Sequence, residues 1–157
     1  MLIKLFDKTI RELYRLFHPH LWGRNLQING IPRIYDIKKL KIGQNVSVNT
    51  DCVLQCYGGL IIGNNVTISD GAKILTRSLR TTNYIENASK REREHIEKEI
   101  EIGDGVWVAA NAVILPGVHI AKNSIIAAGS IVTTDLTDES CLYGGIPAKK
   151  IKELKNK

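Results

Sequence analysis

Aliphatic side chains recur every six residues along most of this chain, and this spacing limits the folds that it can adopt. From Ile42 onward, the positions six residues apart are all isoleucine, valine or leucine. The frame is interrupted by two extra residues near Tyr57 and by a long excursion after Ile74. A period of six over this length indicates a repeat architecture. The positions are Ile42, Val48, Leu54, Ile62, Ile68, Ile74, Ile102, Val108, Ile114, Ile120, Ile126 and Val132.

The residues between these aliphatics predict how each unit folds. Four residues after each one, the side chain is small or slender, as at Val46, Ala72 and Ser124. Three residues after it stand mostly Gly, Asn or Asp, which tolerate the left-handed backbone that tight corners need. Each unit is thus predicted to be a short strand plus a corner. Three units make a coil of about 18 residues, and stacked coils make a parallel β-helix. A β-sandwich is the alternative, although sandwiches keep no fixed corner spacing.

Composition and charge argue against several other classes of protein. The chain has 157 residues and a net charge of +6, from 22 basic and 16 acidic residues. This charge suits an anionic ligand but is too modest and scattered to indicate nucleic-acid binding. No run of about 20 apolar residues is present, as a membrane span would require. The cysteines, Cys52, Cys56 and Cys141, form no paired framework; with no secretory signal at the start, we expect a cytoplasmic protein.

The two ends depart from the repeat, which divides the chain into segments 1–25, 26–137 and 138–157. Residues 2–17 carry an apolar stripe at helical spacing, so an N-terminal amphipathic helix is predicted. We expect this helix to cap the open first coil; weak association with a membrane surface is the alternative. The last segment is expected to be a tail with a short C-terminal helix.

A charged stretch without a core pattern suspends the repeat at residues 77–99. A long insertion in a tight solenoid is usually a functional loop or a disordered one. We therefore expect a loop excursion with a functional role, and a solvated flap is the alternative.

Two segments resemble the hexapeptide-repeat acyltransferase superfamily: IEIGDGVWVAANAVILPGVHIAKNSIIAAGSIVTTD at 100–135 and GGIPAKKIKEL at 144–154. The resemblance covers about residues 26–152 and is greatest for the sugar O-acetyltransferase branch, with galactoside and maltose acetyltransferases as relatives. It implies an all-β, left-handed parallel β-helix that assembles as a homotrimer, with each site between two subunits. The implied reaction is acyl transfer, most simply acetyl transfer from acetyl-CoA to a sugar or sugar-linked acceptor in surface polysaccharide synthesis. No metal is implied.

Acyl transfer to a hydroxyl group needs a general base, and histidine is the usual one. The chain has four histidines, of which two lie in the N-terminal segment and His119 occupies an outward position within the repeat. His95, in the excursion, is the remaining candidate. By the resemblance, the catalytic histidine of galactoside and maltose acetyltransferases falls on Leu79, and that of serine acetyltransferases falls on Cys56. Either His95 replaces them or the protein is not an acetyltransferase.

The resemblance implies further site residues. Asn49 matches an asparagine that helps hold the acceptor, and it follows the inward Val48, so it should face outward. Cys56 is also expected to face outward, although direct transfer needs no cysteine nucleophile. Trp107 should face outward at a subunit contact.

For the donor, small side chains would let the slim pantetheine arm of coenzyme A lie against the backbone. The matching positions are Ala110, Ala128 and Thr133. Basic residues in the tail would meet the phosphates, since lysine binds phosphate as a point charge. These residues are Lys149, Lys150 and Lys152.

Two other functions stay open. One is a non-catalytic scaffold or binding protein, which Leu79 favours because leucine cannot take a proton. The other is a γ-type carbonic anhydrase, which needs three histidines around zinc. Only His95 and His119 lie in the repeat region, so a third zinc ligand is missing from the sequence pattern.

Overall fold

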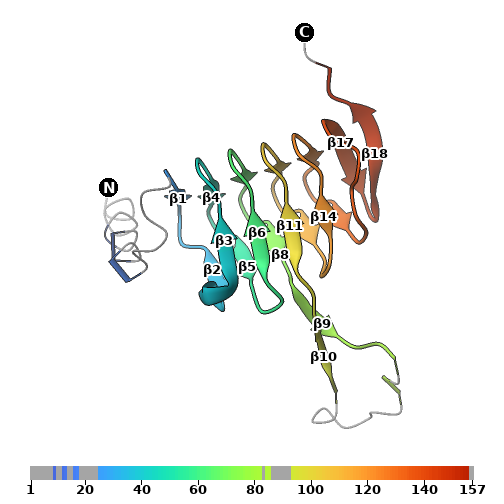
Figure 1. The fold of residues 1–157 in the computed structure, drawn as a ribbon, viewed down its shortest axis with the longest axis horizontal. Helices are drawn as coiled ribbons and strands as arrows, with labels where there is room; N and C mark the ends of the chain where they lie inside the picture. The colour runs from blue at the N-terminus through green and yellow to red at the C-terminus, as the bar shows by residue number, and fades with distance from the viewer. Residues whose placement is uncertain are drawn as a thin grey trace.

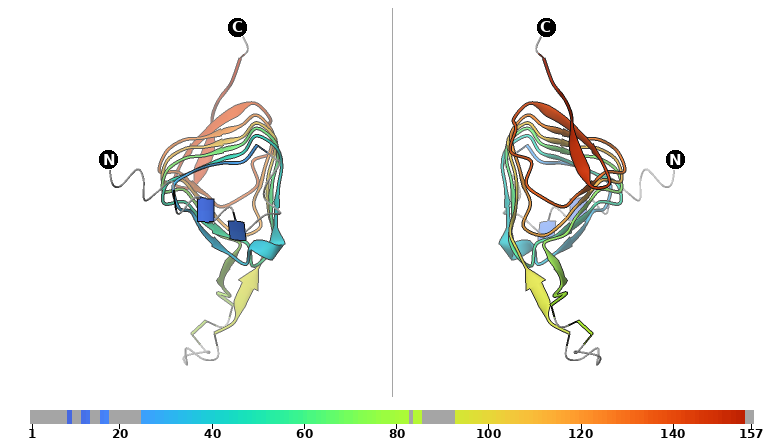
Figure 2. Two further views of the ribbon diagram at one scale, coloured as in Figure 1. Left: turned by 90° about the vertical axis from the view of Figure 1, so that its left-hand side faces the viewer. Right: turned by 90° about the vertical axis from the view of Figure 1, so that its right-hand side faces the viewer.

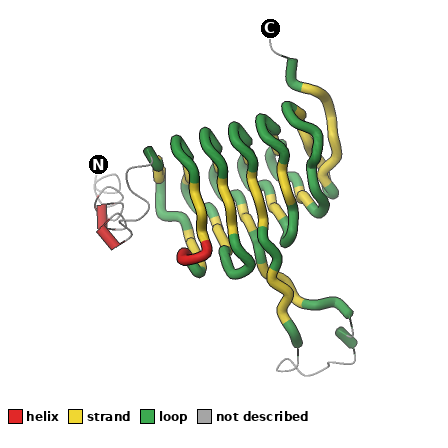
Figure 3. Tube along the Cα trace, in the orientation of Figure 1, coloured by secondary structure: helices red, strands yellow, loops and turns green. Residues whose placement is uncertain are grey.

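Short parallel strands wind around the three sides of a prism in the described part of the chain (Figure 1). The computed structural model describes residues 9, 12, 13, 16, 17, 25–82, 84, 85 and 93–155. Viewed along its axis, the prism has a triangular cross-section (Figure 2). Strands form its sides and loops turn its corners (Figure 3). The expected left-handed parallel β-helix is confirmed.

Three sheets form the sides, and we name them faces A, B and C. Corner AB joins faces A and B, and the other corners are named in the same way. Face A holds β1 (Gln27–Asn29), β4 (Ser47–Asn49), β7 (Thr67–Ile68), β12 (Trp107–Val108), β15 (Ile125–Ile126), β17 (Cys141–Gly145) and β18 (Ala148–Glu153). Face B holds β2 (Arg33–Tyr35), β5 (Val53–Gln55), β8 (Lys73–Ile74), β13 (Val113–Ile114) and β16 (Ile131–Val132). Face C holds β3 (Leu40–Ile42), which follows the short 3-10 helix η2 (Ile37–Lys39), then β6 (Leu60–Ile62), β11 (Ile100–Ile102) and β14 (His119–Ile120).

The predicted inward aliphatics form the core, because parallel pairing stacks equivalent positions of successive coils. On face C, Ile42, Ile62, Ile102 and Ile120 are direct partners along the sheet. Faces A and B stack their aliphatic residues in the same way, and these side chains are buried. Each such burial contributes about 1.5–3 kcal/mol to stability. The core is therefore a set of aliphatic columns running along the prism axis.

The corners use the residues that the repeat predicts there. Asn45, Asn65 and Asn111 have φ values of 55°, 57° and 58°, a left-handed conformation that costs most residues about 1–2 kcal/mol. The Asn45 side-chain amide also donates to Asn65 Oδ1 at 3.1 Å, linking one coil to the next. These side chains therefore fit the corner backbone and tie neighbouring corners together.

The N-terminal helix prediction falls largely outside the described residues. Residues 9, 12, 13, 16 and 17 are helical. Of the predicted apolar stripe, Leu13, Leu16 and Phe17 are 48%, 72% and 73% exposed. The role of this segment as a cap stays a prediction. Within the described part, no helix has the length and apolar character needed to cross a membrane.

The predicted C-terminal helix is wrong. β17 continues face A beside β15, and β18 then returns antiparallel to β17, so the tail is a β-hairpin. The unpaired edge of the last coil explains this outcome, since its N–H and C=O groups need partners. Pairing along that edge overrides the helix preference of the Lys- and Glu-rich tail.

The excursion leaves the prism at corner BC, between β8 and β11 (Figure 1). It is not a loop throughout, because β9 (Arg77–Leu79) and β10 (His95–Glu97) pair antiparallel. We call this pair of strands the ribbon. Oppositely charged residues face each other across it, at 3.7 Å for Arg77–Glu97 and 2.8 Å for Arg80–Glu94. The sequence pattern predicted that these charged residues lie in a loop, whereas some of them form cross-strand ion pairs.

The aliphatic columns predict a sharp contrast in stability between neighbouring positions. Ile74 is fully buried, whereas Lys73 beside it faces outward. Ile74→Ala should lower the free energy of unfolding by about 2–5 kcal/mol, through lost burial and a cavity. Lys73→Ala should change it by less than about 0.5 kcal/mol. Urea unfolding followed by circular dichroism measures both, and equal midpoints for the two variants would contradict this account of the core.

Candidate functional site

His95 lies at the start of β10 and faces Leu79 directly across the ribbon. The Arg80 amide donates to the Glu94 carbonyl at 2.9 Å, and the Lys98 amide donates to the Thr76 carbonyl at 2.9 Å. Because hydrogen-bonded and non-hydrogen-bonded pairs alternate along an antiparallel ladder, His95 and Leu79 form a non-hydrogen-bonded pair. In such pairs the two side chains lie on one face with Cα atoms about 4.5 Å apart. The imidazole therefore lies beside the position where the resemblance puts the catalytic histidine of relatives.

Thr76 fixes the point where the ribbon leaves the prism. Its side chain is fully buried, donates to the Gln55 carbonyl at 3.0 Å and accepts from the Gly58 amide at 3.0 Å. His95 itself is exposed, and no hydrogen bond of its ring is found among the described residues. The ribbon thus has a fixed root and carries a solvent-accessible imidazole away from the prism.

Asn49 lies on the outer side of face A, as predicted, within a polar ladder. Its Oδ1 accepts from Asn29 Nδ2 at 2.9 Å and from Ser47 Oγ at 3.4 Å. Among the described residues its Nδ2 donates to no acceptor.

The small side chains expected at the donor site line corner AB. Ala110 and Ala128 occupy equivalent positions in successive coils, and the Gly129 amide donates to the Ala110 carbonyl at 2.9 Å. Ala128 and Gly129 are exposed, and a β-carbon built on Gly129 would have no neighbour within 4 Å. Thr133 is exposed just beyond β16 on face B. The corner therefore offers a smooth, open strip of backbone.

The three tail lysines lie on β18 but differ in their partners. An open hollow of about 690 Å³ is lined by Lys150, Lys152, Glu153 and Lys155. The Lys150 ammonium already donates to Asp138 at 3.1 Å and Glu153 at 3.2 Å, and these hydrogen bonds raise its pKa. Lys149 and Lys152 are exposed and form no ion pair within the described part of the chain. Of the three predicted lysines, Lys149 and Lys152 are therefore the two whose charges are not paired with a carboxylate among the described residues.

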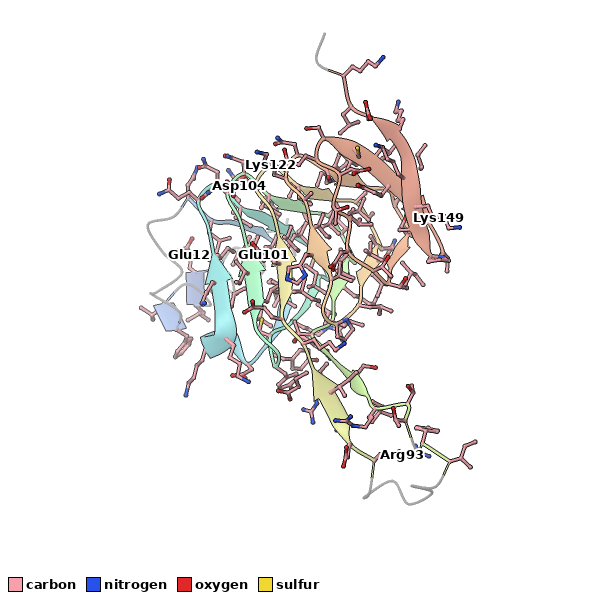
Figure 4. All side chains as sticks on the ribbon, turned by 45° about the vertical axis from the view of Figure 1, so that its right-hand side comes forward. Glu12, Arg93, Glu101, Asp104, Lys122 and Lys149 are labelled. Atoms are coloured by element: carbon pink, nitrogen blue, oxygen red, sulfur yellow. The ribbon has the colours of Figure 1, made fainter. Side chains whose placement is uncertain are left out.

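One chain does not bring all of the predicted site residues together. His95 is carried by the ribbon from corner BC, whereas Ala110 and Ala128 line corner AB and Asn49 lies on face A. The end-on views show the ribbon projecting away from the rest of the triangle (Figure 2). With side chains drawn, Arg93, two residues before β10, and Lys149 on the terminal hairpin are far apart (Figure 4). Within one chain these residues therefore stay at separate corners.

Trp107 faces outward on face A, as predicted, and is 46% exposed. Its indole N–H donates to Ser69 Oγ at 2.8 Å, which fixes the ring orientation. Whether it lies at a subunit contact stays a prediction.

Cys56 does not face outward as expected but is fully buried. It stands two residues after the inward Leu54, and side chains two apart on a strand share a side. Burial, and to a lesser degree the charge of Asp36, raises the pKa of its thiol to about 12. Because the thiolate is the reactive form, Cys56 is unsuited to be a nucleophile.

His119 is exposed on face C, as predicted, between two carboxylates. Its Nδ1 lies 3.3 Å from Asp135 Oδ1, and its Nε2 lies 4.0 Å from Glu101 Oε2. The His119 backbone amide, followed by its ring, lowers the pKa of Asp135. These residues line an open hollow of about 340 Å³. Among the residues that the structure describes, no group of three His, Cys, Asp or Glu side chains could hold a metal ion.

Sequence reasoning missed the contacts of Tyr57, Arg77 and Glu97 at the root of the ribbon. The Arg77 guanidinium lies over the Tyr57 ring, 5.0 Å from its centroid. The charge alternation in the excursion was the available signal, but the register that brings Arg77 to Glu97 depends on where the ribbon turns.

Comparisons with known proteins agree with this geometry. Residues 99–134 match the family model described as bacterial transferase hexapeptide (six repeats). The galactoside O-acetyltransferase of Escherichia coli K12 is 30% identical over 96% of this chain and 70% of its own length. The chain spans 57%, 70% and 50% of the lengths of three curated relatives, among them this enzyme.

Solved structures agree as well. A hexapeptide-repeat acetyltransferase of Vibrio cholerae complexed with acetyl coenzyme A has a TM-score of 0.75 and 28% identity, over 93% of this chain and 78% of that chain. A galactoside acetyltransferase in complex with coenzyme A has a TM-score of 0.73 and 27% identity, over 83% and 64%.

Burial of the cysteines predicts their reactivity. Cys52, Cys56 and Cys141 are free and buried, so a small disulfide reagent at pH 8 should modify none of them in the folded protein and all of them in urea. The raised pKa of Cys56 means that its thiolate becomes abundant only as the pH approaches about 12. Mass spectrometry after timed labelling measures this. Rapid modification of Cys56 in the folded protein at pH 8 would contradict the inert assignment.

Proposed function

The chain belongs to the hexapeptide-repeat acetyltransferase family, and from this premise we propose that it transfers an acetyl group from acetyl-CoA to a hydroxyl group of a sugar or sugar-linked acceptor. The observation that carries the proposal is the register of the ribbon, which puts His95 opposite Leu79. The chain lacks the usual histidine but presents another imidazole at nearly the same place. The sugar acceptor is suggested by the names of the galactoside acetyltransferases.

The proposed chemistry is direct transfer with His95 as general base. The acceptor oxygen attacks the thioester carbonyl carbon while neutral His95 takes the hydroxyl proton. The tetrahedral intermediate then expels the thiolate as the C–S bond breaks, and His95 returns the proton to give the ester and free coenzyme A. General-base catalysis of this kind contributes about 10²–10⁴-fold in rate. Asn49 would orient the acceptor through its free Nδ2 donor.

The donor would lie along corner AB. The pantetheine arm is thin and needs backbone that it can approach closely, which Ala110, Ala128 and the open surroundings of Gly129 supply. Thr133 would donate or accept a hydrogen bond along the arm. The phosphates would meet Lys149 and Lys152, while Lys150 is held by two carboxylates and contributes less.

We propose that the working form is a homotrimer, because the site residues of one chain lie at separate corners. The outer side of face B supports this assembly. Beside Lys73 it presents four partly exposed aliphatic residues, Leu75, Val113, Leu115 and Ile131, whereas the outer side of face C presents Lys41, Glu101 and His119 beside Ile61. An apolar sheet surface is suited to pack against another protein. The three free cysteines support a cytoplasmic location, and surface polysaccharide synthesis is the proposed context.

Moving the imidazole across the ribbon tests His95 as the base. His95→Ala should lower kcat by about 100-fold or more. The double variant His95→Leu with Leu79→His returns an imidazole to the facing position and should recover much of the lost rate, because the two side chains share one face of the ribbon. Coenzyme A release over a panel of sugars measures turnover. Full activity of His95→Ala would end the proposal, and calorimetry showing no binding of coenzyme A would favour the scaffold alternative.

Mixing two inactive variants tests the shared site. His95→Ala removes the base, and Ala128→Trp should block the donor strip; each homotrimer should be inactive. When equal amounts are refolded together, about a quarter of the sites combine an intact base with an intact strip from the neighbouring chain. The mixture should therefore recover about a quarter of the wild-type turnover. No recovery in mixed trimers, verified by native mass spectrometry, would show that the site is not shared.

A further inference from the structure

We propose that Arg77 is a positioning residue for His95, holding the ribbon against the prism through Tyr57 and Glu97. This inference rests on the proposed function, since it concerns how the base is placed. Three observations carry it: the contacts at the ribbon root, the face on which they lie, and the distance from them to His95.

The first observation is that Arg77 joins the ribbon to the prism. Its guanidinium carbon lies 5.0 Å from the centroid of the Tyr57 ring, and its Nε lies 3.7 Å from Glu97 Oε1 on the partner strand. Tyr57 belongs to the turn between β5 and β6, in the preceding coil. One side chain therefore links both strands of the ribbon to a different coil.

Lys39 and Tyr35 extend this contact to the first coil. The Lys39 ammonium donates to the Tyr57 carbonyl and lies 3.8 Å from Glu97 Oε2. The Tyr35 ring stacks on the Tyr57 ring, with centroids 6.3 Å apart and planes inclined by 26°. Residues from three successive coils thus meet at corner BC around the Arg77–Glu97 pair. We call this cluster of Tyr35, Lys39, Tyr57, Arg77 and Glu97 the anchor.

The second observation is that the anchor and the base lie on the same face of the ribbon. Side chains two residues apart on a strand point to the same side. Arg77 and Glu97 therefore share a face with Leu79 and His95. Arg80 and Glu94 lie on the opposite face, although their ion pair is shorter, at 2.8 Å.

The third observation is proximity along the ribbon. On β10, His95 lies two residues before Glu97 in the sequence and farther from the prism, which corresponds to about 7 Å of strand. An isolated two-stranded ribbon has little stability of its own, so its direction depends on what holds its root. A shift of about 1 Å at a reacting group can cost about 10²-fold in rate. At 3.7 Å the Arg77–Glu97 contact is too long for a hydrogen bond, so the anchor should act on geometry more than on folding.

The experiment compares Arg77→Ala with Arg80→Ala, which removes the shorter and more exposed Arg80–Glu94 ion pair from the opposite face of the ribbon. Arg77→Ala should lower kcat at least tenfold while the KM values for acetyl-CoA and acceptor change less than about twofold. It should also speed hydrogen exchange in the peptide covering residues 93–99, measured by mass spectrometry. Arg80→Ala should do neither, and Arg77→Lys, which keeps a cation beside Glu97 and Tyr57, should recover part of the rate.

Two results would overturn the inference. One is unchanged kcat in Arg77→Ala, and the other is an equal loss of kcat in Arg77→Ala and Arg80→Ala. Failure of the proposed function has a separate signature: His95→Ala would keep full turnover. In that case the positioning role would fall with it, while faster exchange in Arg77→Ala would still report that the anchor holds the ribbon.

Discussion

Stacking of each inward aliphatic residue on its equivalent in the next coil is the contact on which the remaining structure depends. Ile68, Val108 and Ile126 on face A, like the isoleucines of face C, are direct partners across parallel strands. Register in a sheet is strongly specified where one side is buried, because a slip by one residue would turn every side chain over. The same register fixes the outward positions. Ala110 therefore lies one coil from Ala128, and Asn49 lies one coil from Asn29. The register of the strands places these residues, and no contact between their side chains is needed.

The prism tolerates an insertion at a corner where the aliphatic stacking is not interrupted. Each coil contacts only its neighbours, so a segment can leave between β8 and β11 if β11 resumes beside β6, as it does. Thr76, buried at the exit, supplies the hydrogen bonds that the interrupted corner would otherwise lack. Beyond that point the ribbon has no core, and its strands are aligned by cross-strand pairs. Such a ribbon can carry a histidine on either strand, so the proposed base role of His95 does not require a histidine at position 79.

Much of the fold could be predicted from the sequence, because period and burial are coupled in a solenoid. The aliphatic spacing predicted the core, and the Asn, Asp and Gly spacing predicted the corners. The outward positions of Asn49, Trp107 and His119 followed from alternation along a strand. Cys56 was misplaced although the same alternation puts it inward. The C-terminal helix was wrong because lysine and glutamate favour a helix locally, whereas the open edge beside β17 was a property of the assembled prism. The candidate site is harder to predict, because the position of His95 depends on the register of the ribbon, which does not follow from a repeat.

The candidate site combines two parts of the chain, the stacked sheets at face A and corner AB and the ribbon at corner BC. Face A and corner AB belong to continuous sheets in which backbone hydrogen bonds hold every coil, so the donor strip is preorganised. The proposed base, His95, stands on the two-stranded ribbon, whose ties to the prism among the described residues are its root and the anchor. Catalysis needs the two parts aligned closely, yet they lie at different corners and, in the proposed trimer, would come from different chains. The contacts that set the angle of the ribbon therefore matter as much as the imidazole it carries. A ribbon held by charge and aromatic contacts at corner BC can be aligned without disturbing the aliphatic columns.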